Sequence, residues 1–121
     1  MTEWTVSELE AIAGLREIRL AGRRVDGSAR TLTTVWHVVV DGAPYVRSMY
    51  GTDGQWYRGV SRHFEGVIDW GAGARDVRFV PDDTHDDDID AALVAKYGDT
   101  SASRHIMTPA SKETTLRIDP K

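Results

Sequence analysis

The sequence predicts a mainly β protein of the α+β class, a small barrel of six antiparallel strands with two or three short helices inserted. Six short runs rich in β-branched and aromatic residues alternate with glycine-containing turns, which indicates an antiparallel sheet. Between two of these runs stands Asp41-Gly42, a dipeptide that favours a tight hairpin. A curved sheet in a chain of 121 residues removes its exposed edges by closing on itself. We therefore expect one barrel domain over residues 1–121.

The first third of the chain predicts one helix and two strands. Thr5 and Glu8 have the spacing of a capping box, which places a helix start at residue 5. Residues 17–21 alternate polar and apolar side chains, as in a strand buried on one side. Residues 31–40 have the strongest strand pattern, and we expect one continuous strand there.

The remaining elements follow from the same periodicities. We expect strands at 44–49, 64–70, 75–80 and 114–119, helical turns at 56–63, a helix at about 86–97, and irregular structure at 101–113.

Composition excludes several classes of protein. There is no cysteine, so disulfides, thiol nucleophiles and cysteine-ligated metals are ruled out. The net charge of −4 disfavours a nucleic-acid partner, which would call for a basic surplus. No run of apolar residues suits a bilayer span, and the first residues lack a secretory pattern. A cytoplasmic protein without nucleic-acid or membrane partners is expected.

The segment 45–58 is the strongest functional candidate. It predicts a strand, a glycine-flanked turn and the start of a helix that carries Trp56, Tyr57 and Arg58. Such a join directs backbone N–H groups, hydroxyls and guanidinium groups towards one point, which suits a phosphate. The neighbouring aromatic side chains suit a flat ring. This segment therefore predicts a pocket for an anionic aromatic ligand.

Two residues of this segment each allow two interpretations. Arg47 is a candidate phosphate or carboxylate ligand, and it is equally well explained by a salt bridge to the acidic helix expected at 86–97. Trp56 is a candidate ring contact or a core residue. Asp53 lies in the same loop, where its carboxylate would repel a phosphate.

The histidines and the acidic run give weaker candidates. His37 stands in the central strand, where it can line a pocket and act as acid or base near neutral pH. No histidine spacing matches a metal site, so no metal is expected. The run 82–90 lacks the glycine and glutamate of a calcium loop, and its carboxylates suit a helix N-terminus.

Several stretches of the chain resemble the bacterial domain-of-unknown-function family 2255, over nearly its whole length. They are Trp36 in a Val-rich strand, Asp41-Gly42, Tyr45-Val46-Arg47-Ser48, Trp56-Tyr57-Arg58, Asp76-Val77-Arg78-Phe79, Lys96-Tyr97-Gly98 and Thr114-Thr115-Leu116-Arg117. That family in turn resembles the FMN-binding split β-barrels, which include pyridoxamine-phosphate oxidases and deazaflavin-dependent nitroreductases. The resemblance implies a split barrel, FMN or a deazaflavin as cofactor, and a homodimer.

The resemblance also implies which residues form the site. In the split barrels a strand, the following loop and the next short helix hold the cofactor phosphate. The matching positions give six cofactor-binding candidates, which are Arg47, Ser48, Gly51, Thr52, Trp56 and Arg58. Deazaflavin-binding relatives have a tryptophan–tyrosine pair at this helix start, which Trp56-Tyr57 matches. Tyr57 and His37 are the catalytic candidates, expected to face the substrate.

Two functions remain open from the sequence. One is a flavin- or deazaflavin-binding oxidoreductase-like protein that acts on a small organic molecule. The other is a cofactor-free small-molecule-binding protein or acid–base enzyme on the same barrel, with a pocket lined by Trp36, Tyr45, Tyr50 and Trp56.

Overall fold

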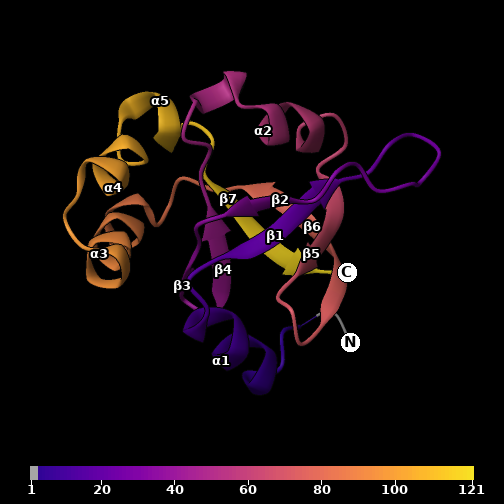
Figure 1. Ribbon diagram of the computed structural model, residues 1–121, viewed down its shortest axis with the longest axis horizontal. Helices are drawn as coiled ribbons and strands as arrows, with labels where there is room; N and C mark the ends of the chain where they lie inside the picture. Colours follow the sequence, from indigo (N-terminus) through magenta and orange to yellow (C-terminus); the bar gives the residue numbers. More distant parts are fainter. Residues whose placement is uncertain (1–2) are drawn as a thin grey trace.

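The computed structural model, which describes residues 3–121, has an antiparallel sheet curled into a half-barrel with helices around it (Figure 1). The strands are β1 (Ile18–Gly22), β2 (Thr33–Val35), β3 (Val38–Val40), β4 (Ala43–Val46), β5 (Glu65–Asp69), β6 (Ala74–Pro81) and β7 (Leu116–Pro120). The helices are α1 (Val6–Gly14), α2 (Gln55–Val60), α3 (Asp86–Tyr97), α4 (Ser101–His105) and α5 (Pro109–Lys112), with a 3-10 turn η1 (Gly51–Asp53).

The sheet has seven strands, so the prediction of six was wrong. The continuous strand expected at 31–40 is broken at Trp36 and His37 into β2 and β3. In the strand order β2-β1-β5-β6-β7-β4-β3, these two pieces form opposite edges of the sheet. Two residues span only about 7–10 Å of extended chain, so the edges must lie near each other. The sheet is therefore bent round until its edges almost meet.

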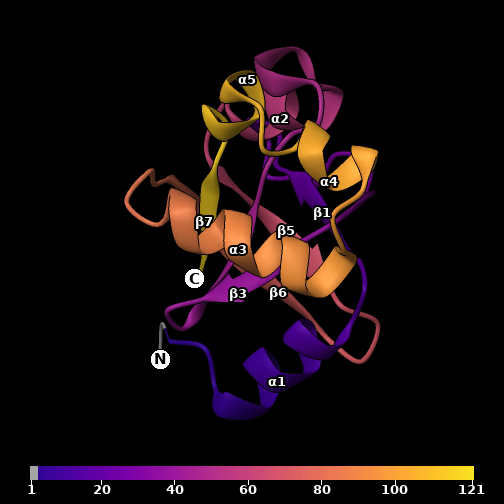
Figure 2. The ribbon, with the colours of Figure 1, turned by 90° about the vertical axis from the view of Figure 1, so that its left-hand side faces the viewer.

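Short helices cover the half-barrel on several sides (Figures 1 and 2). Helices α1 and α2 lie at opposite ends of it, and each sends one fully buried side chain, Ile12 or Val60, into the same apolar cluster. Helix α3 packs along β3. The structure thus has more helices than the two or three expected, because residues 101–113 form α4 and α5.

Local capping explains several of the helix ends. The capping box of Thr5 and Glu8 is confirmed at the start of α1. A second box at Thr100 starts α4, and Thr108 caps α5 with Pro109 in its first turn. Gly98 ends α3 with a positive φ of 84°.

The core consists of two apolar clusters. The first fills the half-barrel and includes Leu20, Ile68, Phe79 and Ile118, all essentially buried. The second lies between the β3–β4 hairpin and helices α3 and α4. The hairpin itself is confirmed, since Asp41 and Gly42 both have positive φ, as its tight turn requires.

Within residues 3–121 there is no helix with the length and apolar character needed to cross a bilayer.

Candidate functional site

A cavity of about 400 Å³ lies beside the end of β2, where four segments converge. These segments are residues 33–36, residues 47–50 after β4, residues 54–56 at the start of α2, and Ile106 after α4. This size is within the range of small-molecule sites. Part of the predicted segment 45–58 lines this cavity.

Residues 48–51 are held in place by the distant segment 110–114. The Ser48 N–H donates to Thr114 Oγ1 at 2.8 Å, and the Ser111 hydroxyl donates to the Ser48 carbonyl at 2.7 Å. Gly51 has a positive φ of 63° and lies against Ala110. These contacts end β4 and turn the chain into η1 and then α2.

Ser48 supplies an unpartnered polar atom in the cavity wall. The residue is 1% exposed, and its hydroxyl has no hydrogen-bond partner among the described residues. A Cβ on Gly54 would lie 2.1 Å from this oxygen, so the hydroxyl lies directly against the glycine, where no other residue type fits. A buried hydroxyl without a partner costs about 1–3 kcal/mol. A ligand in the cavity that reaches this atom would recover part of that cost.

Two half-buried indoles give the cavity its aromatic character. Trp36 stacks on Tyr97 with ring centroids 4.1 Å apart and an interplanar angle of 3°. The Arg16 guanidinium lies 5.3 Å from both of these ring centroids. Trp56 lines the cavity from α2 and meets Tyr57 edge-on. The walls therefore suit a planar ring, and Thr33 and Thr34 add hydroxyls.

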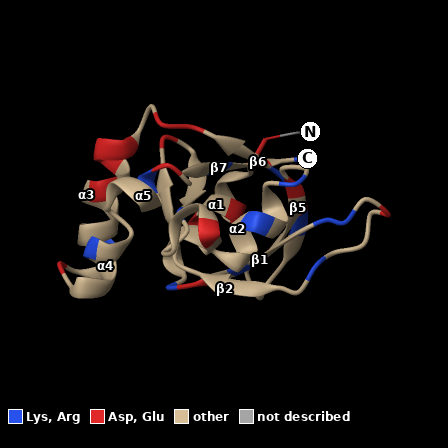
Figure 3. Ribbon diagram, turned by 90° about the horizontal axis from the view of Figure 1, so that it is seen from above, with Lys and Arg blue, Asp and Glu red and all other residues tan. Residues whose placement is uncertain are grey.

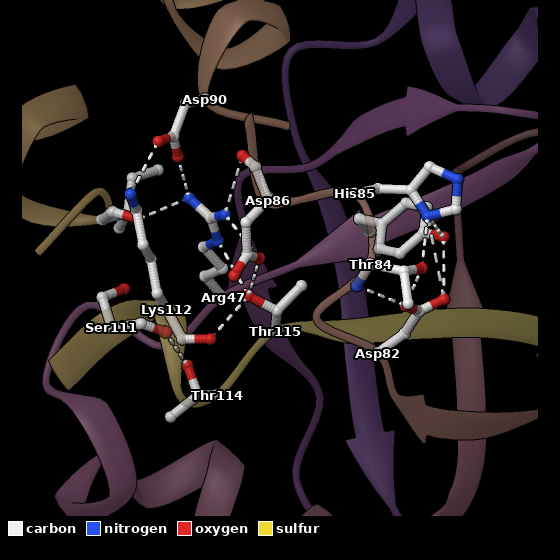
Figure 4. Close-up of polar contacts among 12 residues, drawn as sticks. Arg47, Asp82, Thr84, His85, Asp86, Asp90, Ser111, Lys112, Thr114 and Thr115 are labelled. Carbon is white, nitrogen blue, oxygen red and sulfur yellow. Dashed lines mark hydrogen bonds and ion pairs between the residues drawn. The ribbon is translucent and has the colours of Figure 1, made fainter. Parts of the chain in front are cut away.

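Arg47 lines the cavity, but the N–H donors of its guanidinium group already bond to other protein groups (Figure 4). Its side chain is 1% exposed and pairs with Asp86 at 3.0 Å and Asp90 at 2.5 Å, both on α3. It also donates to Thr115 Oγ1 and to the Ile106 carbonyl. Of the two interpretations of Arg47, the salt bridge to the acidic helix is therefore present. A phosphate contact would require one of these bonds to open.

The Arg47 network also shifts the pKa of a carboxyl group. Burial raises the pKa of Asp90, but hydrogen bonds from Arg47 and Lys112 outweigh this effect and lower it. Asp90 and Asp86 are four residues apart on one face of α3, so the arginine joins that helix to the end of β4.

His37, a predicted catalytic residue, is completely buried and does not line the cavity. Its Nε2 lies 2.6 Å from the Ile12 carbonyl, which can only accept, so Nε2 carries the proton. Nδ1 has no hydrogen-bond partner among the described residues. Desolvation lowers the pKa of His37 to about 4, so the ring is neutral at pH 7. His37 was expected to line a pocket because it would stand in a continuous strand. The strand breaks at this residue, so the alternation of a continuous strand does not decide where the side chain lies.

The other predicted residues are divided between the cavity and its surroundings. Ser48 and Trp56 line it, together with Arg47. Arg58 lines a neighbouring cavity of about 210 Å³. Gly51, Thr52 and Tyr57 line neither of these two cavities, although Tyr57 packs against the barrel core. Asp53, expected to oppose a phosphate, is exposed and also lines neither.

Sequence reasoning missed Gln55 and Ile106, which complete the cavity wall. Ile106 is 58 to 59 positions from Arg47 and Ser48, and it belongs to a stretch expected to be irregular, so no local pattern marked it. Tyr45, expected to line a pocket, instead lies in the second core cluster.

A second polar cluster surrounds Tyr45 away from this cavity (Figure 4). Its hydroxyl contacts Asp82 and His85 at 3.2 Å each. Burial, together with the charge of Asp82, raises the pKa of Tyr45 to about 12. Hydrogen bonds from Thr84 lower the pKa of Asp82 to about 2. In residues 3–121, no group of three or more acidic, histidine or cysteine side chains is arranged to hold a metal ion.

The fold is that of the split β-barrel proteins. The chain is similar to the haem storage protein HutZ from Vibrio cholerae, with 12% identity, 93% of this chain and 86% of that one covered, and a TM-score of 0.64. It is also similar to an FAD-binding protein from Mesorhizobium loti, with 18% identity, 99% and 90% covered, and a TM-score of 0.56. A third similar structure is an F420 reductase, with 19% identity, 93% of this chain and 90% of that one covered, and a TM-score of 0.52.

The chain belongs to the family described as an uncharacterized protein conserved in bacteria, domain of unknown function 2255, whose model matches residues 8–118. The resemblance found in the sequence is thereby confirmed. No curated protein matches the chain. At identities below 20%, the structural likenesses establish the fold, which hosts more than one ligand class among the similar proteins.

Proposed function

We propose that this protein binds a flavin or deazaflavin ring in the cavity beside β2 and serves as an oxidoreductase-like protein for a small organic molecule. The observation that carries the proposal is the unpartnered Ser48 hydroxyl in a cavity lined by two indoles. A ring with a polar edge satisfies both features, because it contacts the indoles and reaches the hydroxyl.

The residues present fit such a cofactor. Trp36 and Trp56 would contact the ring, and Ser48 and Thr33 would hydrogen-bond to its polar edge. Arg58, in the adjoining cavity, would face an anionic group. When bound, the cofactor supplies hydride chemistry, whereas the protein orients it and limits access of water. Neither His37 nor Tyr57 lines this cavity, so the proposal gives them no role in catalysis.

The fold also allows other ligands, since one similar structure is a haem storage protein. A cofactor-free acid–base enzyme that uses His37 receives no support from the buried, neutral ring. The homodimer stays a prediction. Tyr50, which lines the cavity, is 74% exposed in the single chain.

The first test is the absorbance spectrum of freshly purified protein, with mass spectrometry of anything released on denaturation. Thermal shifts with FMN, FAD, a deazaflavin and haem follow. We expect one of the flavin-type ligands to raise the melting temperature. Protein that is colourless and does not respond to any flavin-type ligand would contradict the proposal, and a response to haem alone would replace it.

Ser48→Ala provides a sharper version of this test. The variant removes a hydroxyl that has no partner, so the ligand-free protein should keep or gain stability. Cofactor affinity should fall roughly three- to tenfold, which corresponds to one hydrogen bond. Ser7→Ala is the matched control, because Ser7 is exposed on α1 and far from the cavity. If Ser48→Ala binds the cofactor as tightly as the wild type, Ser48 does not hydrogen-bond to the cofactor.

A further inference from the structure

Two smaller cavities lie next to the cavity beside β2. A cavity of about 210 Å³ shares Thr33, Gln55 and Trp56 with it. That cavity in turn shares Arg30, Gln55 and Gly59 with another of about 210 Å³. Because they share these lining residues, the three cavities adjoin one another along α2, and we call this row of cavities the groove, which is aromatic at one end. We refer to the other end, which contains Arg30, Arg58 and Arg62, as the arginine cleft.

The three guanidinium groups of the arginine cleft have no counterion among the described residues. Within residues 3–121 no hydrogen bond or ion pair joins the side chain of Arg30, Arg58 or Arg62 to another group. Arg24, which also reaches the groove, donates to Ser28 and Ala29 within its own loop. In Figure 3, basic stretches of the ribbon lie along the loop between β1 and β2 and on α2.

Arg30 is held at the cleft by close packing. A Cβ added to Gly59 would lie only 2.9 Å from the Cδ of Arg30. Because glycine has no side chain, the apolar stem of Arg30 can lie against α2. Its Nε is buried and has no hydrogen-bond partner among residues 3–121. A buried N–H donor without an acceptor is unfavourable, and an anion in the cleft would supply that acceptor.

We propose that the arginine cleft binds the anionic tail of the ring-bearing ligand, and that this tail carries at least two negative charges. Three unpaired guanidinium groups match a phosphomonoester or a diphosphate, which they can bind through several N–H donors at once. The inference rests on the proposed function, because the aromatic cavity is the other end of the same groove. It places the charged group at Arg30, Arg58 and Arg62 instead of at Arg47, whose donors are already engaged.

The test compares ligands that differ only in their tails. Riboflavin, FMN and FAD are titrated into the wild type and the double variant Arg30→Met/Arg62→Met, and binding is followed by flavin fluorescence. Pyrophosphate and inorganic phosphate are assayed separately by thermal shift. Arg78→Met is the control for loss of charge, because Arg78 is exposed on β6 and lines a different cavity.

We expect the wild type to bind FMN or FAD at least about tenfold more tightly than riboflavin, as charge-assisted hydrogen bonds imply. This preference should disappear in the double variant, with riboflavin binding unchanged, and it should weaken with added salt. A preference for FAD over FMN identifies a diphosphate, and the reverse identifies a phosphomonoester. Arg78→Met should behave like the wild type.

The outcomes separate the two proposals. Equal affinity for riboflavin, FMN and FAD, with no response to pyrophosphate or phosphate, overturns the arginine cleft and leaves the flavin site intact. If pyrophosphate or phosphate stabilises the wild type but not the double variant, and no flavin binds, the cleft stands and the proposed function fails.

Discussion

At the scale of the residue, His37 shows how burial decides protonation. It lies between the two edge strands, where its backbone N–H donates to the Tyr97 hydroxyl at 2.9 Å. Lys96 donates to its carbonyl at 3.0 Å, so a positive charge lies beside the ring. Desolvation, reinforced by the Lys96 charge, lowers the pKa of His37 from 6.5 to about 4. The Ile12 carbonyl, which favours the protonated form, only partly offsets these effects.

This pKa predicts a loss of stability in acid. Between pH 6.5 and pH 4 the unfolded chain protonates His37 while the folded protein does not, so unfolding becomes easier as the pH falls through this window. From pH 7.5 to pH 5 the free energy of unfolding should drop by about 2 kcal/mol on this account. Urea titrations at the two pH values measure it.

The His37→Gln variant should lose most of that pH dependence, because its side chain does not titrate. His105→Gln, which changes an exposed histidine on α4, serves as the control. Equal pH dependence in the wild type and His37→Gln would show that His37 is not the group responsible.

At the scale of the element, α3 is joined to the end of β4 by a buried ion pair and by apolar packing. Arg47 provides the ion pair, and Ile89 and Leu93 provide the packing. Lys112 of α5 also pairs with Asp90 at 2.8 Å, so three elements meet at one carboxylate (Figure 4). Because Ile106 accepts a bond from Arg47, the same network supports one wall of the candidate site.

Arg47→Met should therefore lower the free energy of unfolding by about 2–4 kcal/mol, since it leaves the partly buried Asp86 without an ion pair and leaves Asp90 with Lys112 alone. Chemical denaturation measures the loss. Arg19→Met is the matched control, because the pair of Arg19 with Asp69 is half exposed and should contribute less than about 1 kcal/mol. Similar losses in both variants would mean that the network contributes no more than a surface ion pair.

At the scale of the whole molecule, the curl of the sheet depends on close approach between strands. Gly66 in β5 pairs with Gly22 of β1. A Cβ at Gly66 would lie 2.0 Å from the Ala21 carbonyl oxygen and 2.9 Å from the Phe79 ring. Glycine within a strand often marks a sharp bend in a barrel. No side chain fits here without separating β1 from β5.

Gly66→Ala should accordingly lower the free energy of unfolding by about 2–4 kcal/mol, with a lower melting temperature in calorimetry. Gly14→Ala is the control, because a Cβ at Gly14 meets nothing within 4 Å. It stands in the last turn of α1, where alanine should be neutral or stabilising by up to about 1 kcal/mol. A Gly66→Ala protein as stable as the wild type would show that the sheet adapts without cost.

Much of the fold could be predicted because its signals are local. The capping box at Thr5, the turn at Asp41-Gly42 and the end of α3 at Gly98 each depend on a few adjacent residues. Alternation and turn residues likewise located most strands. The helices at 101–112 were missed because each is only four or five residues long, although Thr100, Thr108 and Pro109 carried the capping signal.

The sequence by itself determined the class of fold, the family and the region of the candidate site. Only the tertiary structure decided that residues 31–40 divide into two edge strands and that Arg47 is paired with α3. It also showed that the Ser48 hydroxyl has no partner among the described residues. The physical reason is distance along the chain. The partners of Arg47 lie 39 to 68 positions away, and no local propensity records which distant group a buried guanidinium will reach.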